Sequence, residues 1–343
     1  MSKGLALITG INGFIAARTA LTFLQAGYRV RGTARSISST KPLISAIPAE
    51  LAVNLEIFEV PDITAPGAFD KAIEGVTTVA HLAAPVSLSF TDPEPVLIAA
   101  VEGALRVLES AITEPSVESF IFMSSIAAIT DTESSKTSFD ESDWNDSAER
   151  LVKELGTNTP GHIIYFASKT AAERAVWKFR DDYNPSFKIA ALNPVFVAGP
   201  PVVVPDSKEK IHTTTKLISD VYSGTELAKS GIPGALPSYV DVRDVARVIL
   251  FGAENPDKVN GERFLLSGYH VPAQAVADIL RERYPEREGM IEKGEPGQGY
   301  EKVYGYPKEK FFDGSKVVKV TGVGYTPWEE TVVDFVESVK AVL

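Results

Sequence analysis

The sequence predicts an α/β protein built on a doubly wound parallel sheet, with a smaller lobe formed mainly by its C-terminal part. Up to Pro194, short apolar runs alternate with longer helical patterns, as expected when helices cover both faces of a buried parallel sheet. A glycine-rich turn joins the first apolar run directly to the first helical pattern. After Pro194 the alternation becomes irregular. These three features indicate a Rossmann-type sheet with a less regular lobe.

The individual elements follow from the length and period of each pattern. Buried parallel strands are expected at 5–9, 28–33, 55–60, 78–82, 120–124 and 189–193. The helices between them are expected at 15–26, about 66–73, 96–112 and 165–183. Regular patterns return at 239–251 and 264–267, and helices are expected near 211–222, 272–285 and 328–342.

The prolines mark where the second part begins, since Pro cannot continue a helix or a central strand. They crowd one region, at Pro200, Pro201, Pro205, Pro233 and Pro237. We expect a nucleotide-binding domain at 1–194 plus about 239–271. A substrate-binding lobe is expected at 195–238 plus about 272–343, over the carboxyl edge of the sheet, where ligands of such sheets bind.

Composition excludes several classes of function. The 343 residues carry a net charge of −11 without a basic cluster, which argues against nucleic acid and anionic membranes as partners. There is no Cys, and the four His are scattered, so neither a disulfide framework nor a metal site is expected. No run is long and apolar enough to span a membrane. We expect a cytosolic protein that acts on a small molecule, as a monomer or homodimer.

The turn after the first strand has the features of a dinucleotide site. Gly10 permits a tight turn, Gly13 lets backbone approach a pyrophosphate, and Ala16 supplies a small residue for packing of the helix on the strand. The N–H groups at the start of the following helix then face the phosphates. Because the turn lies between a strand and a helix, the pattern is specific.

The end of the second strand indicates which dinucleotide binds. An NAD site needs an acidic residue there, whereas this chain has Arg31 and Arg35 and no acid. Since a guanidinium can bind a phosphate in bidentate fashion, we expect NADPH, with Arg35 as the main ligand of the 2′-phosphate and Arg31 as the second. After the third strand, Asp62 can accept from the adenine amino group and Ile63 can cover the ring; a turn or helix cap is a nearly equal interpretation of Asp62.

Tyr165 and Lys169 are the strongest candidates for the chemistry. Residues four apart share one face of a helix, so an ammonium lies beside a phenol and favours its ionised form. Two further pairs with this spacing, Tyr304/Lys308 and Tyr306/Lys310, lie where Gly305 and Pro307 oppose a helix. Only the Tyr165 pair begins a long segment free of Gly and Pro, so only this pair is expected on a helix.

Two hydroxyls end the strand that precedes this helix. Ser124 and Ser125 follow the apolar run at 120–123, and the end of that strand faces the ligand crevice. A hydroxyl there can donate to a carbonyl and to the oxyanion formed on its reduction. Serines at such positions are otherwise strand-end caps, and the neighbouring Tyr/Lys helix favours the catalytic interpretation.

The combination resembles the extended short-chain dehydrogenase/reductases, and in particular their dihydroflavonol-reductase-like branch. The resemblance rests on the glycine turn and on the segments Arg31–Arg35, His81–Pro85, Asp140–Trp144, Tyr165–Glu173 and Tyr239–Ala246. It implies an NADPH-dependent carbonyl reductase of the kind found among plant dihydroflavonol reductases and fungal aldehyde/ketone reductases. It covers nearly the whole chain, and 200–238 is its least matched part.

The resemblance also implies roles for single residues. Tyr165 is the general acid, Lys169 holds the nicotinamide ribose and lowers the pKa of Tyr165, and Ser125 hydrogen-bonds the carbonyl. The implied cofactor-binding positions are Thr9, Gly10, Asn12, Gly13, Phe14, Ile15, Arg35, Asp62, Ile63, Ala83 and Pro194. The substrate pocket is expected to be lined by apolar residues together with the catalytic hydroxyls: Val86, Phe90, Ser125, Ile126, Tyr165, Val195 and Phe196.

Two other functions fit part of these patterns. A nucleotide-sugar epimerase or dehydratase uses the same site but usually retains NAD, which Arg35 argues against. A non-enzymatic NADP(H)-binding module tends to lose the Tyr/Lys pair, which this chain keeps. Asp241, Arg243 and Asp244 are interpreted as a structural charge cluster at a helix start.

Overall fold

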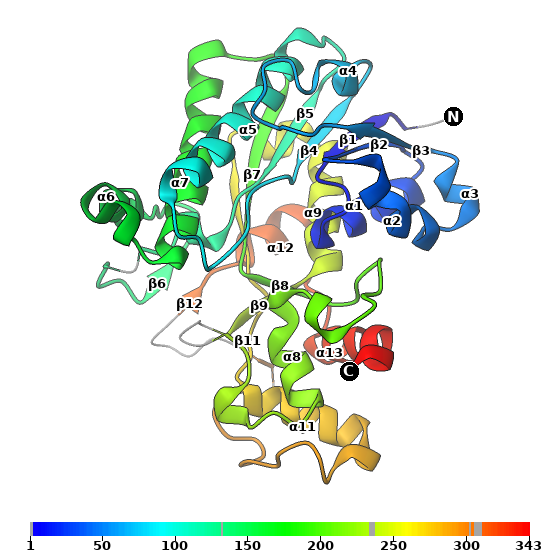
Figure 1. Cartoon of the computed structure of the whole chain (residues 1–343), viewed down its shortest axis with the longest axis vertical. Helices are drawn as coiled ribbons and strands as arrows, with labels where there is room; N and C mark the ends of the chain where they lie inside the picture. Colours follow the sequence, from blue (N-terminus) through cyan, green and yellow to red (C-terminus); the bar gives the residue numbers. More distant parts are fainter. Residues whose placement is uncertain (1–2, 132, 233–236, 302, 305–310) are drawn as a thin grey trace.

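The computed structural model describes residues 3–131, 133–232, 237–301, 303–304 and 311–343, and its largest element is a seven-stranded parallel sheet (Figure 1). The strand order is β10-β7-β5-β4-β1-β2-β3, which confirms the predicted doubly wound topology. The strand bounds are β1 (Leu5–Thr9), β2 (Arg29–Ala34), β3 (Leu55–Glu59), β4 (Thr78–His81), β5 (Ser119–Met123), β7 (Lys188–Pro194) and β10 (Arg263–Leu266). The first six agree with predicted strands to within one residue, and β10 lies at the regular pattern expected at 264–267.

Helices cover both faces of this sheet. Along β1, Ala6 and Ile8 pack into the hydrophobic cluster under one layer of helices, and Leu5 and Leu7 into the cluster under the other, because successive side chains of a strand point to opposite faces. The first layer contains α1 (Phe14–Gln25), α9 (Val242–Glu254) and α12 (Ser315–Thr321). The second contains α4 (Asp70–Ile73), α5 (Pro93–Thr113) and α7 (Gly161–Tyr183).

Some helices differ from their predicted extent. The helix expected at 66–73 is reduced to α4, after a turn at Gly67, whose φ is +71°. The described chain also contains helices that the patterns did not indicate, namely α2 (Lys41–Ala46), α3 (Ala49–Ala52), α6 (Asp146–Leu155), α10 (Pro256–Val259) and α12. The first two are short, and Pro48 separates them. Helix α6 is capped by Asn145, whose side chain accepts a hydrogen bond from Ala148 N at 3.1 Å. This capping residue was the sequence signal from which the helix could have been predicted.

A second, three-stranded sheet organises the lobe. Its order is β11 (Tyr269–His270), β9 (Ser238–Asp241) and β8 (Phe196–Ala198). The lobe helices α8 (Lys216–Tyr222), α11 (Ala273–Arg283) and α13 (Trp328–Val339) share a hydrophobic cluster with it. The boundaries predicted at 239 and 271 therefore fall at strands that pair within the small sheet. The division of the chain into two domains stays a prediction.

Short elements complete the described chain. Helix α10 (Pro256–Val259) leads into β10, and β12 (Phe311–Phe312) pairs with β6 (Ser138–Phe139). Residues 305–310 lie outside the described residues. They include Tyr306, Lys308 and Lys310, which are three of the four members of the two other Tyr/Lys pairs. Within the described part, no helix has the length and apolar character needed to cross a membrane.

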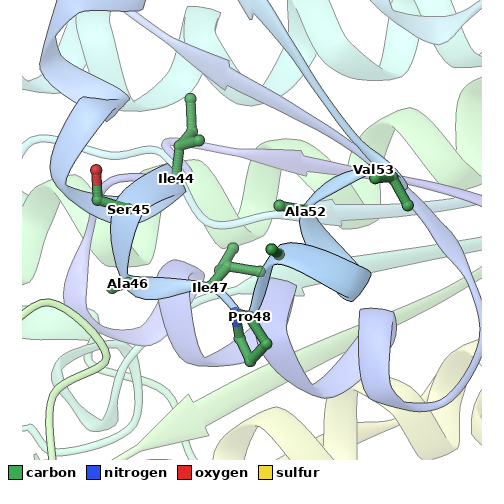
Figure 2. A pocket seen from close by; sticks show the side chains of 8 residues that line it. Ile44, Ser45, Ala46, Ile47, Pro48, Ala52 and Val53 are labelled. Atoms are coloured by element: carbon green, nitrogen blue, oxygen red, sulfur yellow. The ribbon is translucent and has the colours of Figure 1, made fainter.

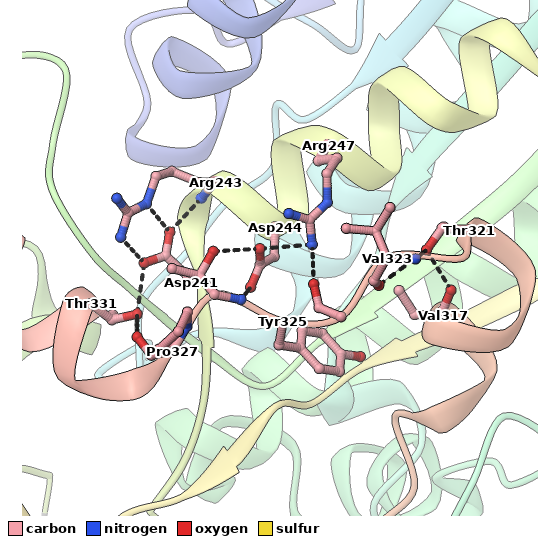
Figure 3. Close-up of polar contacts among 12 residues, drawn as sticks. Asp241, Arg243, Asp244, Arg247, Val317, Thr321, Val323, Tyr325, Pro327 and Thr331 are labelled. Carbon is pink, nitrogen blue, oxygen red and sulfur yellow. Dashed lines mark hydrogen bonds and ion pairs between the residues drawn. The ribbon is translucent and has the colours of Figure 1, made fainter.

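A cluster of carboxylates and guanidinium groups joins the lobe to α9 (Figure 3). Asp241 caps α9 by accepting from Arg243 N at 2.7 Å, and its other oxygen accepts from Thr331 Oγ1 at 2.8 Å. Asp244 accepts from Thr326 N at 2.8 Å and pairs with Arg247 at 2.9 Å. The structural interpretation of Asp241, Arg243 and Asp244 therefore agrees with their contacts, which hold the segment 324–331 against the start of α9.

Candidate active site

The carboxyl ends of β1 and β4 are joined by one buried hydroxyl. Thr9 Oγ1 accepts hydrogen bonds from Leu82 N at 2.9 Å and Ala83 N at 3.0 Å, and lies 2.9 Å from His81 Nδ1. Because the two amides use both lone pairs of the hydroxyl, its one proton is donated to His81 Nδ1. Burial lowers the pKa of His81 to about 3, and the charge of Lys169 adds to that effect. His81 is thus a neutral structural group, and Thr9 fixes the position of Ala83 relative to the glycine turn.

The glycine turn has the compact geometry that a phosphate-binding turn requires. Gly10 has a φ of +66°, and a β-carbon at this residue would lie 3.1 Å from Ala83 Cα. Gly13 N donates to Gly10 O at 2.9 Å, and a β-carbon at Gly13 would lie 3.2 Å from that same oxygen. Helix α1 then begins at Phe14, with Ile15 half-buried beside it. The absence of two β-carbons leaves the turn open directly in front of the first N–H groups of α1.

The two arginines after the glycine turn have different surroundings. Arg35 is exposed and follows β2 immediately, while Asn12 of the glycine turn donates to Ser39 Oγ in the same loop at 3.2 Å. Arg31 is already engaged, because its guanidinium donates to the carbonyls of Ala72 and Glu74, both at 2.9 Å. It also pairs with Glu56 at 3.1 Å and lies 4.7 Å from the centre of the Phe58 ring. These contacts join β2 to the end of α4 and leave the guanidinium of Arg31 less free than that of Arg35 to bind a phosphate; the role of Arg31 as second ligand stays a prediction.

At the end of β3, Asp62 makes the contacts of a turn residue, and its contact with adenine stays a prediction. Its Oδ1 accepts from Thr64 N at 2.8 Å and from Thr64 Oγ1 at 2.7 Å, which closes a turn. These bonds lower the pKa of Asp62. An adenine contact would therefore have to use Oδ2. Ile63 is half-buried against α5, where a β-carbon at Gly103 would lie 2.7 Å from Ile63 Cδ1.

Tyr165 and Lys169 lie on α7 as predicted, with the Lys169 ammonium nitrogen 6.0 Å from the centre of the Tyr165 ring. Lys169 is buried, and its Nζ donates to Met123 O at the end of β5 at 3.4 Å. Burial lowers the pKa of Lys169 to about 8, partly offset by the charge of Glu173. The pKa of Tyr165 is raised by burial, and a hydrogen bond from Ser125 lowers it in part. The pKa of Tyr165 is thus raised overall and not lowered as expected, because desolvation of the phenolate is the largest effect.

The two serines at the end of β5 separate clearly. Ser125 is the one bonded to the Tyr165 hydroxyl, and its Oγ also accepts from Ala127 N at 3.2 Å. Ser124 turns the other way and donates to Glu173 Oε2 at 2.5 Å. Ser125 therefore lies in the site with Tyr165 and Lys169, whereas Ser124 binds the buried carboxylate of Glu173.

The predicted pocket residues are not equally placed. Val86 is 67% exposed, and Phe90 and Ile126 are half-buried, all near the carboxyl edge of the sheet. Val195 is only 5% exposed and packs in the cluster under α1 and α9. Phe196 packs in the lobe core, with its ring 5.9 Å from that of Tyr239. Val195 thus offers little open surface to a substrate, whereas Phe196 is half-buried. Pro194 at the end of β7 is also buried.

Several residues near the site were not indicated by the sequence patterns. His212 of the lobe stacks on Phe14, with ring centres 5.0 Å apart, and burial lowers its pKa. Gly161, at the start of α7, lies against the backbone of the loop at 88–90. Glu173 continues the spacing of Tyr165 and Lys169 by one further turn, which was the available signal for it.

A shallow hollow of about 730 Å³ lies elsewhere, on α2 and α3 beside the edge strand β3 (Figure 2). It is lined by small and aliphatic side chains, with Ile44, Ile47 and Val53 the largest. None of the predicted site residues lines it. In the described part of the chain, no three His, Asp or Glu side chains gather closely enough to hold a metal ion.

A doubly wound sheet that brings a glycine turn, a serine and a Tyr/Lys pair to its carboxyl edge has the architecture of the extended short-chain dehydrogenase/reductases. The chain belongs to the NAD dependent epimerase/dehydratase family, whose model matches residues 6–267. The predicted family is thereby confirmed.

Two relatives and one solved structure illustrate the similarity. NADPH-dependent methylglyoxal reductase GRE2 of Saccharomyces cerevisiae is 33% identical over 85% of this chain and 86% of its own length. Ketoreductase azaE of Aspergillus niger is 31% identical over 97% of this chain and 96% of its own length. Among solved structures, yeast methylglyoxal/isovaleraldehyde reductase Gre2 complexed with NADPH superimposes with a TM-score of 0.85 at 28% identity, covering 99% of this chain and all of that one.

Proposed function

We propose that the chain is an NADPH-dependent carbonyl reductase, which reduces a ketone or an aldehyde to the alcohol with Tyr165 as proton donor. The observation that carries the proposal is the arrangement of Ser125, Tyr165 and Lys169 at the carboxyl edge, beside an open glycine turn. The relatives named as NADPH-dependent reductase and ketoreductase support the same class of enzyme.

The residues present fit the proposed cofactor. Gly10 and Gly13 keep the turn before α1 free of side chains, as a pyrophosphate requires. Arg35 is exposed at the end of β2, where an NAD enzyme would have an acid. We assign the 2′-phosphate to Arg35, the pyrophosphate to the turn from Thr9 to Ile15, the adenine to Asp62 and Ile63, and the nicotinamide end to Ala83, Pro194 and Lys169. NADPH, when bound, supplies the hydride for the carbonyl carbon.

The protein supplies the proton and orients the carbonyl. Because burial raises the pKa of Tyr165, its hydroxyl is protonated at neutral pH and can give its proton to the carbonyl oxygen. Ser125 donates a hydrogen bond to the same oxygen as negative charge develops there. Lys169, with a pKa of about 8, is mainly charged at pH 7 and stabilises the phenolate that remains after proton transfer.

The two alternative functions are less well supported. A nucleotide-sugar epimerase or dehydratase that retains NAD has no use for Arg35 in place of an acid. A regulatory module has no need for a half-buried Tyr and a buried Lys placed together beside a serine. The cytosolic location and the monomeric or homodimeric state expected from the sequence stay predictions.

The experiment is to follow NADPH absorbance with an activated ketone, with NADH in parallel. We expect turnover with NADPH and at most a tenth of that rate with NADH. Tyr165→Phe should abolish turnover while NADPH binding, measured by fluorescence, stays near normal. Equal rates with both cofactors would overturn the assignment of Arg35, and an active Tyr165→Phe variant would remove Tyr165 from its role.

A further inference from the structure

Glu173 is a carboxylate without any exposed surface, two turns after Tyr165 and one after Lys169 on α7. Four side chains donate to it, one each from the end of β5, from β7, from β10 and from α7 itself. Ser124 Oγ and Asn193 Nδ2 approach Oε2 at 2.5 and 2.8 Å. Arg263 Nε and Trp177 Nε1 approach Oε1 at 2.5 and 3.3 Å. The carboxylate is therefore fixed in one orientation.

Two of these donors lead directly to the catalytic serine. Ser124 precedes Ser125 in the chain, and Asn193 Nδ2 donates to Ser125 O at 3.1 Å as well as to Glu173. An amide nitrogen has two protons, so both bonds can exist together. Glu173 thus fixes the backbone of Ser125 in two ways, through Ser124, which precedes it, and through Asn193 of β7. The Oδ1 atom of Asn193 is buried and has no hydrogen-bond partner in the described structure, so these two bonds alone orient the amide.

The charge of Glu173 also acts on Lys169. Its carboxylate raises the pKa of Lys169 against the larger effect of burial. The other titratable groups around Lys169 are Tyr165 on the same helix and His81 on β4, which is neutral because burial lowers its pKa to about 3. Arg263, on the far side of the carboxylate, is the opposing charge. Glu173 is therefore the negative group that favours the ammonium form of Lys169.

Arg263 anchors this arrangement from β10. Its Nη1 donates to Glu141 O at 2.8 Å and to Asp143 O at 2.6 Å, and its guanidinium lies 3.9 Å from the centre of the Trp144 ring. A buried ion pair often adds little net stability, since desolvation offsets the attraction. The Glu173–Arg263 ion pair lies directly behind Ser125 and Lys169, and this position indicates a role in orienting these two residues.

We propose that Glu173 is a positioning residue for the reduction, which holds the Ser125 hydroxyl and the Lys169 ammonium in the arrangement that Tyr165 needs. This inference rests on the proposed function. It assigns Glu173 no contact with the substrate, and Arg263, Asn193 and Ser124 act through it. Groups that orient catalytic residues in this way commonly contribute ten- to a hundredfold to activity.

The test compares Glu173→Gln with the wild type in NADPH-dependent reduction of the same ketone across pH. We expect kcat to fall about ten- to a hundredfold, with the KM for NADPH changed less than threefold. The pKa of Lys169 should fall without the neighbouring carboxylate, so the alkaline loss of activity should begin at lower pH. Glu149→Gln is the matched control, because Glu149 pairs with Arg174 on the outer side of α7; its kcat and pH profile should equal those of the wild type.

Two further variants keep the test decisive if Glu173→Gln does not fold. Glu173→Gln/Arg263→Gln removes both buried charges, and Ser124→Ala removes one bond to the carboxylate. We expect the double variant to shift the alkaline limb in the same direction but by less, because the opposing charge of Arg263 is also removed, and Ser124→Ala to lower kcat several-fold. A folded Glu173 variant with wild-type kcat and pH profile would overturn the inference. So would unfolding of both Glu173 variants together with a wild-type kcat for Ser124→Ala, because the carboxylate would then serve the fold alone. If Tyr165→Phe is active, the proposed function fails instead.

Discussion

Gly161 lies so close to Phe90 that a β-carbon on residue 161 would stand 2.7 Å from both the amide nitrogen and the carbonyl oxygen of Phe90. It would also stand 2.7 Å from Leu88 O. Gly161 opens the helix that carries Tyr165. The contact therefore sets the distance between the predicted substrate loop, 86–90, and the proton donor one turn further along α7.

Gly161→Ala should change how the substrate binds. Alanine suits a helix, but its β-carbon forces the backbone at 88–90 to move. We expect the KM for the ketone to rise at least threefold, with the Kd for NADPH unchanged; steady-state kinetics and a fluorescence titration measure the two. Gly289→Ala is the control, since no atom lies within 4 Å of that β-carbon position. An unchanged KM in Gly161→Ala would show that the loop does not contact the substrate.

The two arginines of the β2 segment should have separate effects. Arg35→Ala should raise the KM for NADPH at least tenfold and leave that for NADH nearly unchanged, because only NADPH carries the 2′-phosphate. Arg31→Ala should instead lower stability by about 1–3 kcal/mol, since it removes the charged donor of two backbone carbonyls, of which the bond to Ala72 is part-buried. Cofactor kinetics and urea unfolding of both variants distinguish the roles. A larger rise in the KM for NADPH in Arg31→Ala than in Arg35→Ala would contradict the assignment.

Ser125→Ala should alter both the rate and its pH dependence. Loss of one donor to a developing oxyanion costs about a hundredfold or more in kcat. The hydrogen bond from Ser125 lowers the pKa of Tyr165, so its removal should raise that pKa. Oxidation of the alcohol needs the phenolate, and its rate should then rise only at higher pH than in the wild type. A shift of this limb toward lower pH would contradict the bond described.

Thr9→Val should destabilise the fold and weaken cofactor binding together. The methyl group replaces a hydroxyl that accepts from Leu82 N and Ala83 N, so two amides at the end of β4 lose their acceptor. We expect a loss of about 2 kcal/mol or more in the free energy of unfolding, measured with urea. Thr9→Ser keeps the hydroxyl and should lose less than half as much; equal losses would assign the effect to packing.

The sheet could be predicted from the sequence because parallel strands buried on both faces are apolar throughout. Leu5–Thr9 and Ser119–Met123 are buried along their whole length, and such runs stand out against helical patterns. The small sheet lacked this signal. Its strands Phe196–Ala198 and Tyr269–His270 have three and two residues, too few for a period to be recognised.

The candidate site was predictable where its residues follow a local rule. The glycine turn and the Tyr165/Lys169 spacing are of this kind. Arg31 could not be assigned from its strand, because the carbonyls that bind it belong to residues 41 and 43 positions later. The partner of Glu173 lies 90 positions away, and no local pattern reports such a contact.

The position of β10 in the chain has a consequence for biosynthesis. Six strands of the large sheet are complete at Pro194, but the seventh, which brings Arg263, follows only after most of the small sheet has been made. Until the ribosome has released that segment, Glu173 has no guanidinium to pair with, and the outer edge of β7 stays open. Such an edge is prone to pair with other chains. The nascent protein therefore passes through a stage in which an unpaired strand edge lies beside its future catalytic centre.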